Sequence, residues 1–315
     1  MIERHATIHG ALHPLRATDL TASDFAAAIG DSPFKTPLEL YAEKTGHLQP
    51  KGETAVMKRG RLLEQVAITM AREEHPDWDI RYPLNLYLRD PELRLGATPD
   101  AQRVNADGSV TNMQIKVINR RIFEDEWVPS GPPLHYVLQT GIEGMLMDAE
   151  GSMIIALVVD YAALELFYFD VPRHPDAEAQ FKEHAKAFWD NVITGNRPAA
   201  DLKRDAATLV ALFPKSVKDP VLDLSQENQL PGMLDKRIVL KEEIKHREAE
   251  VDEIETYIKD KLGPAERATL PGWKITWPTK HRRSYTVAAK DYRRLYISKT
   301  DEDIEQDNER QEATP

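Results

Sequence analysis

Polar and apolar residues alternate in the second half of residues 94–119, and this pattern predicts two antiparallel strands. The Asp107-Gly108 pair between the two halves is a hairpin turn signal. A strand sends alternate side chains to opposite faces, so Gln114 and Lys116 are expected to project from one face. The hairpin can also bring Asp100, which ends the first half, beside them.

Helical patterns surround this hairpin. Residues 21–24 form a capping box before a short helix that ends at Gly30. Pro37 marks the first turn of the next helix, over 36–46. Apolar residues at helical spacing predict three longer helices, the first with Val56 on its buried face. Their ranges are 56–74, 135–147 and 175–193.

The continuous apolar run 152–159 predicts a strand covered on both faces, with 163–171 as its neighbour. Together these elements indicate an α/β (α+β) fold in which helices flank a mixed central sheet. We expect a core over 1–198, a linker over 199–228, an accessory region over 229–300 and a disordered acidic tail over 301–315. The accessory region combines a long charged helix (229–262) with candidate strands at 272–278 and 283–287.

The net charge of −11 is unfavourable for binding nucleic acid, but residues 301–315 carry −6 of it and leave −5 on the remainder. Local basic clusters decide DNA binding more than the total does. The best accessory cluster comprises His281, Arg282, Arg283, Arg293 and Arg294, with a solvated surface as the alternative. The absence of cysteine excludes disulfides and thiolate-held metals. No apolar run has membrane-spanning length and no signal-peptide core is present, so we expect a cytoplasmic protein without a membrane partner.

The chemistry expected at the hairpin is metal-assisted hydrolysis of a phosphodiester. Oxygen ligands from Asp100 and Gln114 suit magnesium, and Lys116 can orient or deprotonate a water. A plain surface hairpin is the alternative. Glu64 lies at the margin of its helix's apolar stripe, so it is either a solvated edge residue or an inward-pointing site residue.

Other polar residues leave two interpretations open. Arg16 and Ser23, beside a helix N-terminus, form either a phosphate pocket or an ordinary capped helix. Arg120 and Arg121 suit phosphate contacts or a surface charge pair. Gln139, the polar residue on an apolar helix face, can satisfy a buried backbone group or bind a water or phosphate.

With these residues placed, the chain resembles the lambda exonuclease group, or YqaJ-like viral recombinases, of the PD-(D/E)xK nucleases. The resemblance covers about residues 12–195 and implies a restriction-endonuclease-like core. It rests on motifs in family order: Leu15-Arg16, residues 20–30, Gly60 to Glu64, residues 97–100, Gln114 to Lys116, and Tyr136 to Gln139.

The resemblance assigns a role to each of these residues. It implies that Asp100 and the Ile115 carbonyl bind Mg²⁺, with Mn²⁺ as the alternative metal, and that Gln114 stands where the family has an acidic ligand. Lys116 positions the attacking water. The further residues are Glu64 as a second acid, Gln139 as a supporting residue, and Arg16, Ser23 and Thr98 as the holders of a DNA 5′-phosphate.

The implied function is that of a deoxyribonuclease: a metal-dependent 5′-to-3′ exonuclease acting on double-stranded DNA ends. It would leave single-stranded tails for a partner annealing protein in phage-type recombination, and a ring-shaped homo-oligomer fits the group. Gln114 reflects a constructed Glu-to-Gln change, a natural variant that still binds metal, or a relative that has lost cleavage. The rival hypotheses are a non-catalytic DNA-end scaffold and an endonuclease on the same fold.

Overall fold

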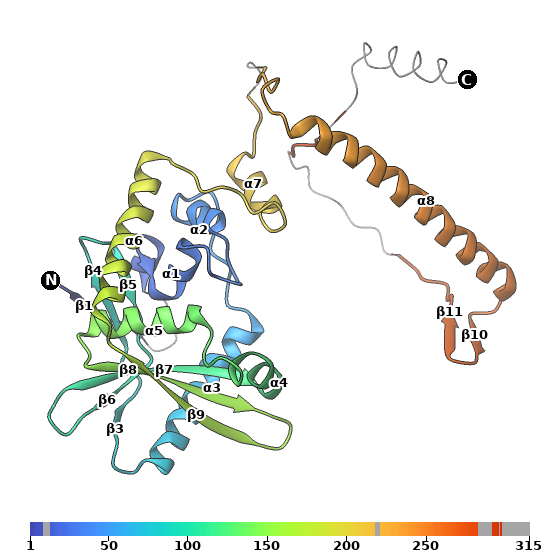
Figure 1. Ribbon diagram of the computed structural model, residues 1–315. Coiled ribbons are helices and arrows are strands. Elements are labelled where there is room, and N and C mark those ends of the chain that lie inside the picture. Colours follow the sequence, from blue (N-terminus) through green and yellow to red (C-terminus); the bar gives the residue numbers. More distant parts are fainter. Residues whose placement is uncertain (9–12, 218–220, 283–291, 296, 298–315) are drawn as a thin grey trace. The chain divides into compact units, whose positions relative to one another are not determined.

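The computed structural model describes residues 1–8, 13–217, 221–282, 292–295 and 297. The chain divides into two compact units, Met1–Pro214 and a second unit from Lys215 onward. The strands and helices of each unit are labelled in Figure 1. The candidate site residues all belong to the first unit.

The first unit is built on a five-stranded sheet with the order β3-β6-β7-β8-β9. Its strands are β3 (Asp79–Arg81), β6 (Ala101–Val104), β7 (Val110–Asn119), β8 (Gly151–Val159) and β9 (Leu164–Pro172). β7 and β8 run parallel and the other pairs antiparallel. The predicted β6–β7 hairpin is confirmed, and Gly108 in its turn has a φ of 86°, a conformation that suits glycine. The expected mixed sheet is therefore present.

Two helices cover opposite faces of this sheet (Figure 1). α3 (Ala55–Glu74) packs Ala67 and Ile68 against Met113 and Ile115 of β7. α5 (Leu134–Met147) covers the other face, where the Asn112 side chain donates a hydrogen bond to the Thr140 carbonyl at 3.2 Å. The polar positions of β7 thus face α5, as the alternation predicted.

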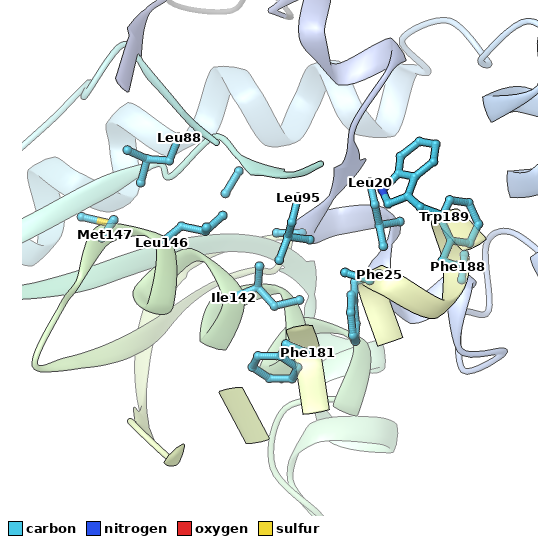
Figure 2. Packing of buried hydrophobic residues seen from close by; sticks show 14 of the residues in the cluster. Leu20, Phe25, Leu88, Leu95, Ile142, Leu146, Met147, Phe181, Phe188 and Trp189 are labelled. Carbon is cyan, nitrogen blue, oxygen red and sulfur yellow. The ribbon is translucent and has the colours of Figure 1, made fainter. Parts of the chain in front are cut away.

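A second sheet, which the sequence pattern did not predict, lies beside the first. Its order is β1-β4-β5-β2, from β1 (Glu3–Ala6), β4 (Leu86–Asp90), β5 (Leu95–Ala97) and β2 (Leu20–Thr21). Figure 2 shows Leu20 and Leu95 on the side of Ile142 of α5, and Leu88 near Leu146 and Met147 of the same helix. Two further helices close this core, α1 (Ala22–Ala28) and α6 (Pro175–Thr194).

The predicted caps of the early helices are confirmed. The Thr21 hydroxyl accepts a hydrogen bond from the Asp24 amide at 3.2 Å and begins α1. α2 (Pro37–Lys44) begins with Pro37 in its first turn. The short elements are a 3₁₀ turn (Pro14–Ala17), α4 (Arg120–Ile122), a π-helical turn (Phe123–Trp127) and α7 (Ala206–Leu212).

The first unit extends beyond the predicted core of 1–198. The buried Asp205 accepts a hydrogen bond from the Thr36 hydroxyl at 2.6 Å, next to α2. Arg204 donates to the carbonyls of Ser32 and Pro33, each at 3.2 Å. Residues expected in the linker are therefore fixed to the first unit by specific hydrogen bonds.

The second unit contains α8 (Leu230–Leu262) and a hairpin of β10 (Arg267–Leu270) and β11 (Trp273–Thr276). Apolar residues of α8 such as Leu240 and Ile244 are exposed. The predicted strand at 283–287, Arg283 and the acidic tail lie outside the described residues. In the part of the chain that the structure describes, no helix has the length and apolar character needed to cross a membrane.

Candidate active site

Seven of the predicted site residues line one cleft of about 600 Å³ in the first unit. Its walls come from both sheets, from α1, α3 and α5, and from the loops between them. The residues that concern its chemistry are Arg16, Ser23, Glu64, Thr98, Asp100, Lys116, Gln139 and Glu143.

Asp100 is fixed by its position at the start of β6. Ala101 pairs with Met113, so Asp100 lies opposite Gln114. The Gln114 side-chain amide donates a hydrogen bond to Asp100 Oδ2 at 2.5 Å, and the Ile115 backbone amide donates to the same oxygen at 2.9 Å. One carboxylate oxygen is thereby held by two donors, which orients the group.

Gln114 does not line the cleft. Its side chain is buried, and its Oε1 has no hydrogen-bond partner among the described residues. The amide of Gln114 therefore acts on Asp100 and adds no charge to the site.

Lys116 is held by α5. Its Nζ donates a hydrogen bond to Gln139 Oε1 at 2.9 Å and lies 4.7 Å from the centre of the Tyr136 ring. Burial lowers the pKa of Lys116, although the charges of Asp100, Glu143 and Glu64 oppose this shift. Lys116 is thus placed at the cleft with its ammonium held in one position.

Glu64 points inward from α3, which decides between its two interpretations. The Tyr82 hydroxyl donates a hydrogen bond to its carboxylate at 3.5 Å, and both side chains line the cleft. Burial, followed by the negative charge of Asp100, raises the pKa of Glu64 to about 8, while Lys116 opposes the shift.

Glu143 is a site residue that the sequence reasoning missed. It lies one turn after Gln139 on α5, and Gln139 Nε2 donates to its Oε1 at 2.8 Å. The residue is only 1% exposed, and its Oε2 accepts no hydrogen bond in the described structure. Burial and the charge of Asp100 raise the pKa of Glu143 to about 8, against Lys116, Gln139 and Asn112. Its only signal in the sequence was the four-residue spacing from Gln139.

The three residues expected to hold a 5′-phosphate are brought together. The Arg16 guanidinium donates hydrogen bonds to the Thr98 hydroxyl at 3.1 Å and to the Ser23 hydroxyl at 3.3 Å. Lys44 donates to the Arg16 carbonyl at 2.9 Å and fixes the backbone there. A cation with two hydroxyls at one end of the cleft suits an anionic group.

Arg120 and Arg121 are not brought to the cleft. Arg120 forms an ion pair with Glu165 at 2.5 Å. Arg121 has a side chain that is 91% exposed and lies 3.4 Å from Asp125. Neither lines the cleft, so their expected DNA contact stays a prediction that concerns the outer surface.

The oxygen donors of the cleft fit a divalent cation of the magnesium type. No group of three or more His, Cys, Asp or Glu that could hold a metal is found among the described residues. Mg²⁺, however, is commonly held through one or two carboxylates together with waters. The buried Oε2 of Glu143, for which no hydrogen bond is found among the described residues, and the carboxylate of Asp100 line the same cleft and offer oxygens of this kind.

The chain is similar to a known protein family and to a known bacterial protein. Residues 12–143 match the YqaJ-like viral recombinase domain. The chain is 23% identical over 284 residues to the uncharacterised protein YqaJ of Bacillus subtilis (strain 168), a match that covers 88% of this chain and 85% of YqaJ.

Two solved structures are similar to part of this chain. An alkaline exonuclease (LHK-Exo) from Laribacter hongkongensis has a TM-score of 0.47 at 19% identity, covering 62% of this chain and 96% of that protein. A phage-related exonuclease from Haemophilus somnus 129PT has a TM-score of 0.41 at 11% identity, covering 56% and 96%. The sequence match ends at residue 143, before the expected limit of 195. The resemblance expected from the ordered motifs is confirmed over residues 12–143, which match the YqaJ-like viral recombinase domain.

Proposed function

We propose that this protein is a metal-dependent deoxyribonuclease that degrades double-stranded DNA from 5′ ends. The observation that carries the proposal is the sharing of one cleft by two groups of residues. Asp100, Glu64 and Lys116 form a hydrolytic group, and Arg16 with Thr98 forms an anion-binding group. The match to a viral recombinase domain supports a role in recombination.

Each residue of the cleft has a separate role in the proposed reaction. A bound Mg²⁺ or Mn²⁺ supplies positive charge that stabilises the phosphate in the transition state. Asp100, held by the Gln114 and Ile115 amides, is an oriented oxygen ligand for that cation, and the Ile115 carbonyl is a further candidate ligand. Lys116, held by Gln139, orients the attacking water. Glu64, from α3, is a second acid that lines the same cleft.

The anion-binding group explains why such an enzyme would act only at the 5′ end of a DNA strand. A terminal phosphate carries more negative charge than a phosphodiester and can accept hydrogen bonds from the Arg16 guanidinium and the Thr98 hydroxyl. Once that phosphate is bound, the adjoining phosphodiester of the same strand is presented to Asp100 and Lys116. The result is digestion of one strand from its 5′ end, and the exposed complementary strand would serve an annealing partner.

The proposal is tested by the polarity of digestion. Linear duplex DNA labelled on either the 5′ or the 3′ end is incubated with Mg²⁺ and compared with a covalently closed circle. We expect early release of the 5′ label, late release of the 3′ label and an intact circle. Early release of the 3′ label would refute the polarity, and cutting of the circle would favour the endonuclease hypothesis.

A non-catalytic DNA-end scaffold is the second candidate, because Gln114 is neutral where the resemblance places an acidic ligand. A scaffold would bind linear duplex in Mg²⁺ without consuming it. Electrophoretic mobility shift and product analysis on the same samples distinguish the two functions, since bound and intact DNA supports only the scaffold.

A further inference from the structure

Glu143 is a buried acid that lines the same cleft as Asp100 and Lys116. It is 1% exposed, and its Oε1 accepts a hydrogen bond from Gln139. Its Oε2 lacks a hydrogen-bond partner in the described residues although the side chain lines the cleft. Burying a carboxylate costs free energy unless it is paired, and a glutamine of the same size would avoid that cost.

Gln114 is neutral, so the site lacks a negative charge at the position where the resemblance places an acidic ligand. It holds Asp100 through its amide, but it carries no charge and does not line the cleft. Asp100 and Glu143 line the same cleft, so the two carboxylates share one polar pocket. A divalent cation would compensate both carboxylates at once.

We propose that Glu143 supplies the second carboxylate of the divalent-cation site, together with Asp100, in place of the acid that Gln114 does not provide. Glu143 then acts from α5, whereas Gln114 acts from β7. The inference rests on the proposed function, because that function requires a divalent cation in this cleft. It differs from that function in naming which side chain completes the site.

The test measures Mn²⁺ binding to the full chain without DNA, by electron paramagnetic resonance of free Mn²⁺. Glu143→Gln preserves the shape of the side chain and its contact with Gln139. We expect this variant to weaken Mn²⁺ binding by at least about tenfold, in line with the loss of one functional group around a metal. Glu183→Gln, at an exposed position of α6, is the matched control and should leave binding unchanged.

Two further variants separate charge supply from mere packing. The exchanged pair Gln114→Glu with Glu143→Gln restores one carboxylate at the site and should recover much of the affinity for Mn²⁺. Glu143→Asp keeps the charge and should bind more strongly than Glu143→Gln. Thermal unfolding without metal checks that each variant is folded. If Glu143→Gln binds Mn²⁺ as tightly as the unaltered chain, or if the unaltered chain binds none, the proposal is overturned.

The failure of this inference and that of the proposed function give different results. If the unaltered chain binds Mn²⁺ through Glu143 but leaves linear DNA intact, the nuclease function fails and the assignment of Glu143 stands. If the unaltered chain digests DNA and Glu143→Gln binds Mn²⁺ normally, the function stands and the assignment of Glu143 fails.

Discussion

Replacing Arg16 by glutamine is expected to remove the preference for 5′-phosphorylated ends. In the structure the guanidinium donates to the hydroxyls of Thr98 and Ser23, at 3.1 and 3.3 Å, and lines the same cleft as Asp100. These two contacts aim the guanidinium at the position proposed for the terminal phosphate. Glutamine keeps a donor but loses the positive charge and the forked geometry.

The size of the effect follows from the kind of bond that is lost. A hydrogen bond to a charged group contributes about 1.5–3 kcal/mol. Because 1.4 kcal/mol corresponds to a factor of ten, kcat/KM on phosphorylated ends should fall by roughly 10- to 150-fold. Ends that carry a 5′-hydroxyl never form this bond, so their slower digestion should change little.

The assay measures kcat/KM on two duplexes that differ only in the 5′-phosphate. The unaltered chain should prefer the phosphorylated duplex, and Arg16→Gln should digest both at similar rates. Lys186→Gln, at an exposed position of α6 away from the cleft, is the control for a general loss of positive charge. An equal fall on both duplexes would refute the reasoning, because Arg16 would then not read the terminal phosphate.

Three other changes have defined outcomes. Lys116→Met should lower the cleavage rate by at least about 100-fold while DNA binding in a mobility shift is retained; normal cleavage would contradict its role. Gly96→Ala should lower the free energy of unfolding in urea by about 1–3 kcal/mol, because the added methyl group overlaps the Tyr87 hydroxyl, which is bonded to buried Asp19. Burial and Asp100 raise the pKa of Glu143 to about 8, from 4.5 in the unfolded chain, so stability present below pH 4.5 is lost as the pH rises through 8. The melting temperature without metal should therefore fall over that range, and a flat profile would contradict this.

The parts of the fold that could be predicted from the sequence are those that local chemistry specifies. The Asp107-Gly108 turn and the alternation of β7 fix the hairpin, and the hairpin in turn sets Asp100 opposite Gln114. The Thr21 hydroxyl cap and Pro37 likewise begin α1 and α2 where expected, because both signals need only residues within one turn.

The second sheet could not be predicted because its strands pair residues that are far apart in the sequence. Leu20 pairs with Leu95, far away in the sequence, through strands too short to show a period. Val56 was expected in the core, but it is 68% exposed, because helical spacing does not reveal where a helix leaves its packing partner. Glu143 was missed for a similar reason. Whether a carboxylate is buried with an unpartnered oxygen depends on tertiary contacts, and the spacing of residues does not show it.

The most direct test of the account is digestion of linear, 5′-phosphorylated duplex DNA by the unaltered chain in Mg²⁺, with EDTA as the control and Gln114→Glu in parallel. The account predicts metal-dependent digestion by the unaltered chain, because its own residues provide the carboxylates of the cleft. If only the Gln114→Glu variant digests the DNA, the unaltered site lacks an acidic ligand, and Glu143 does not replace it. Intact DNA with both chains would contradict the nuclease function.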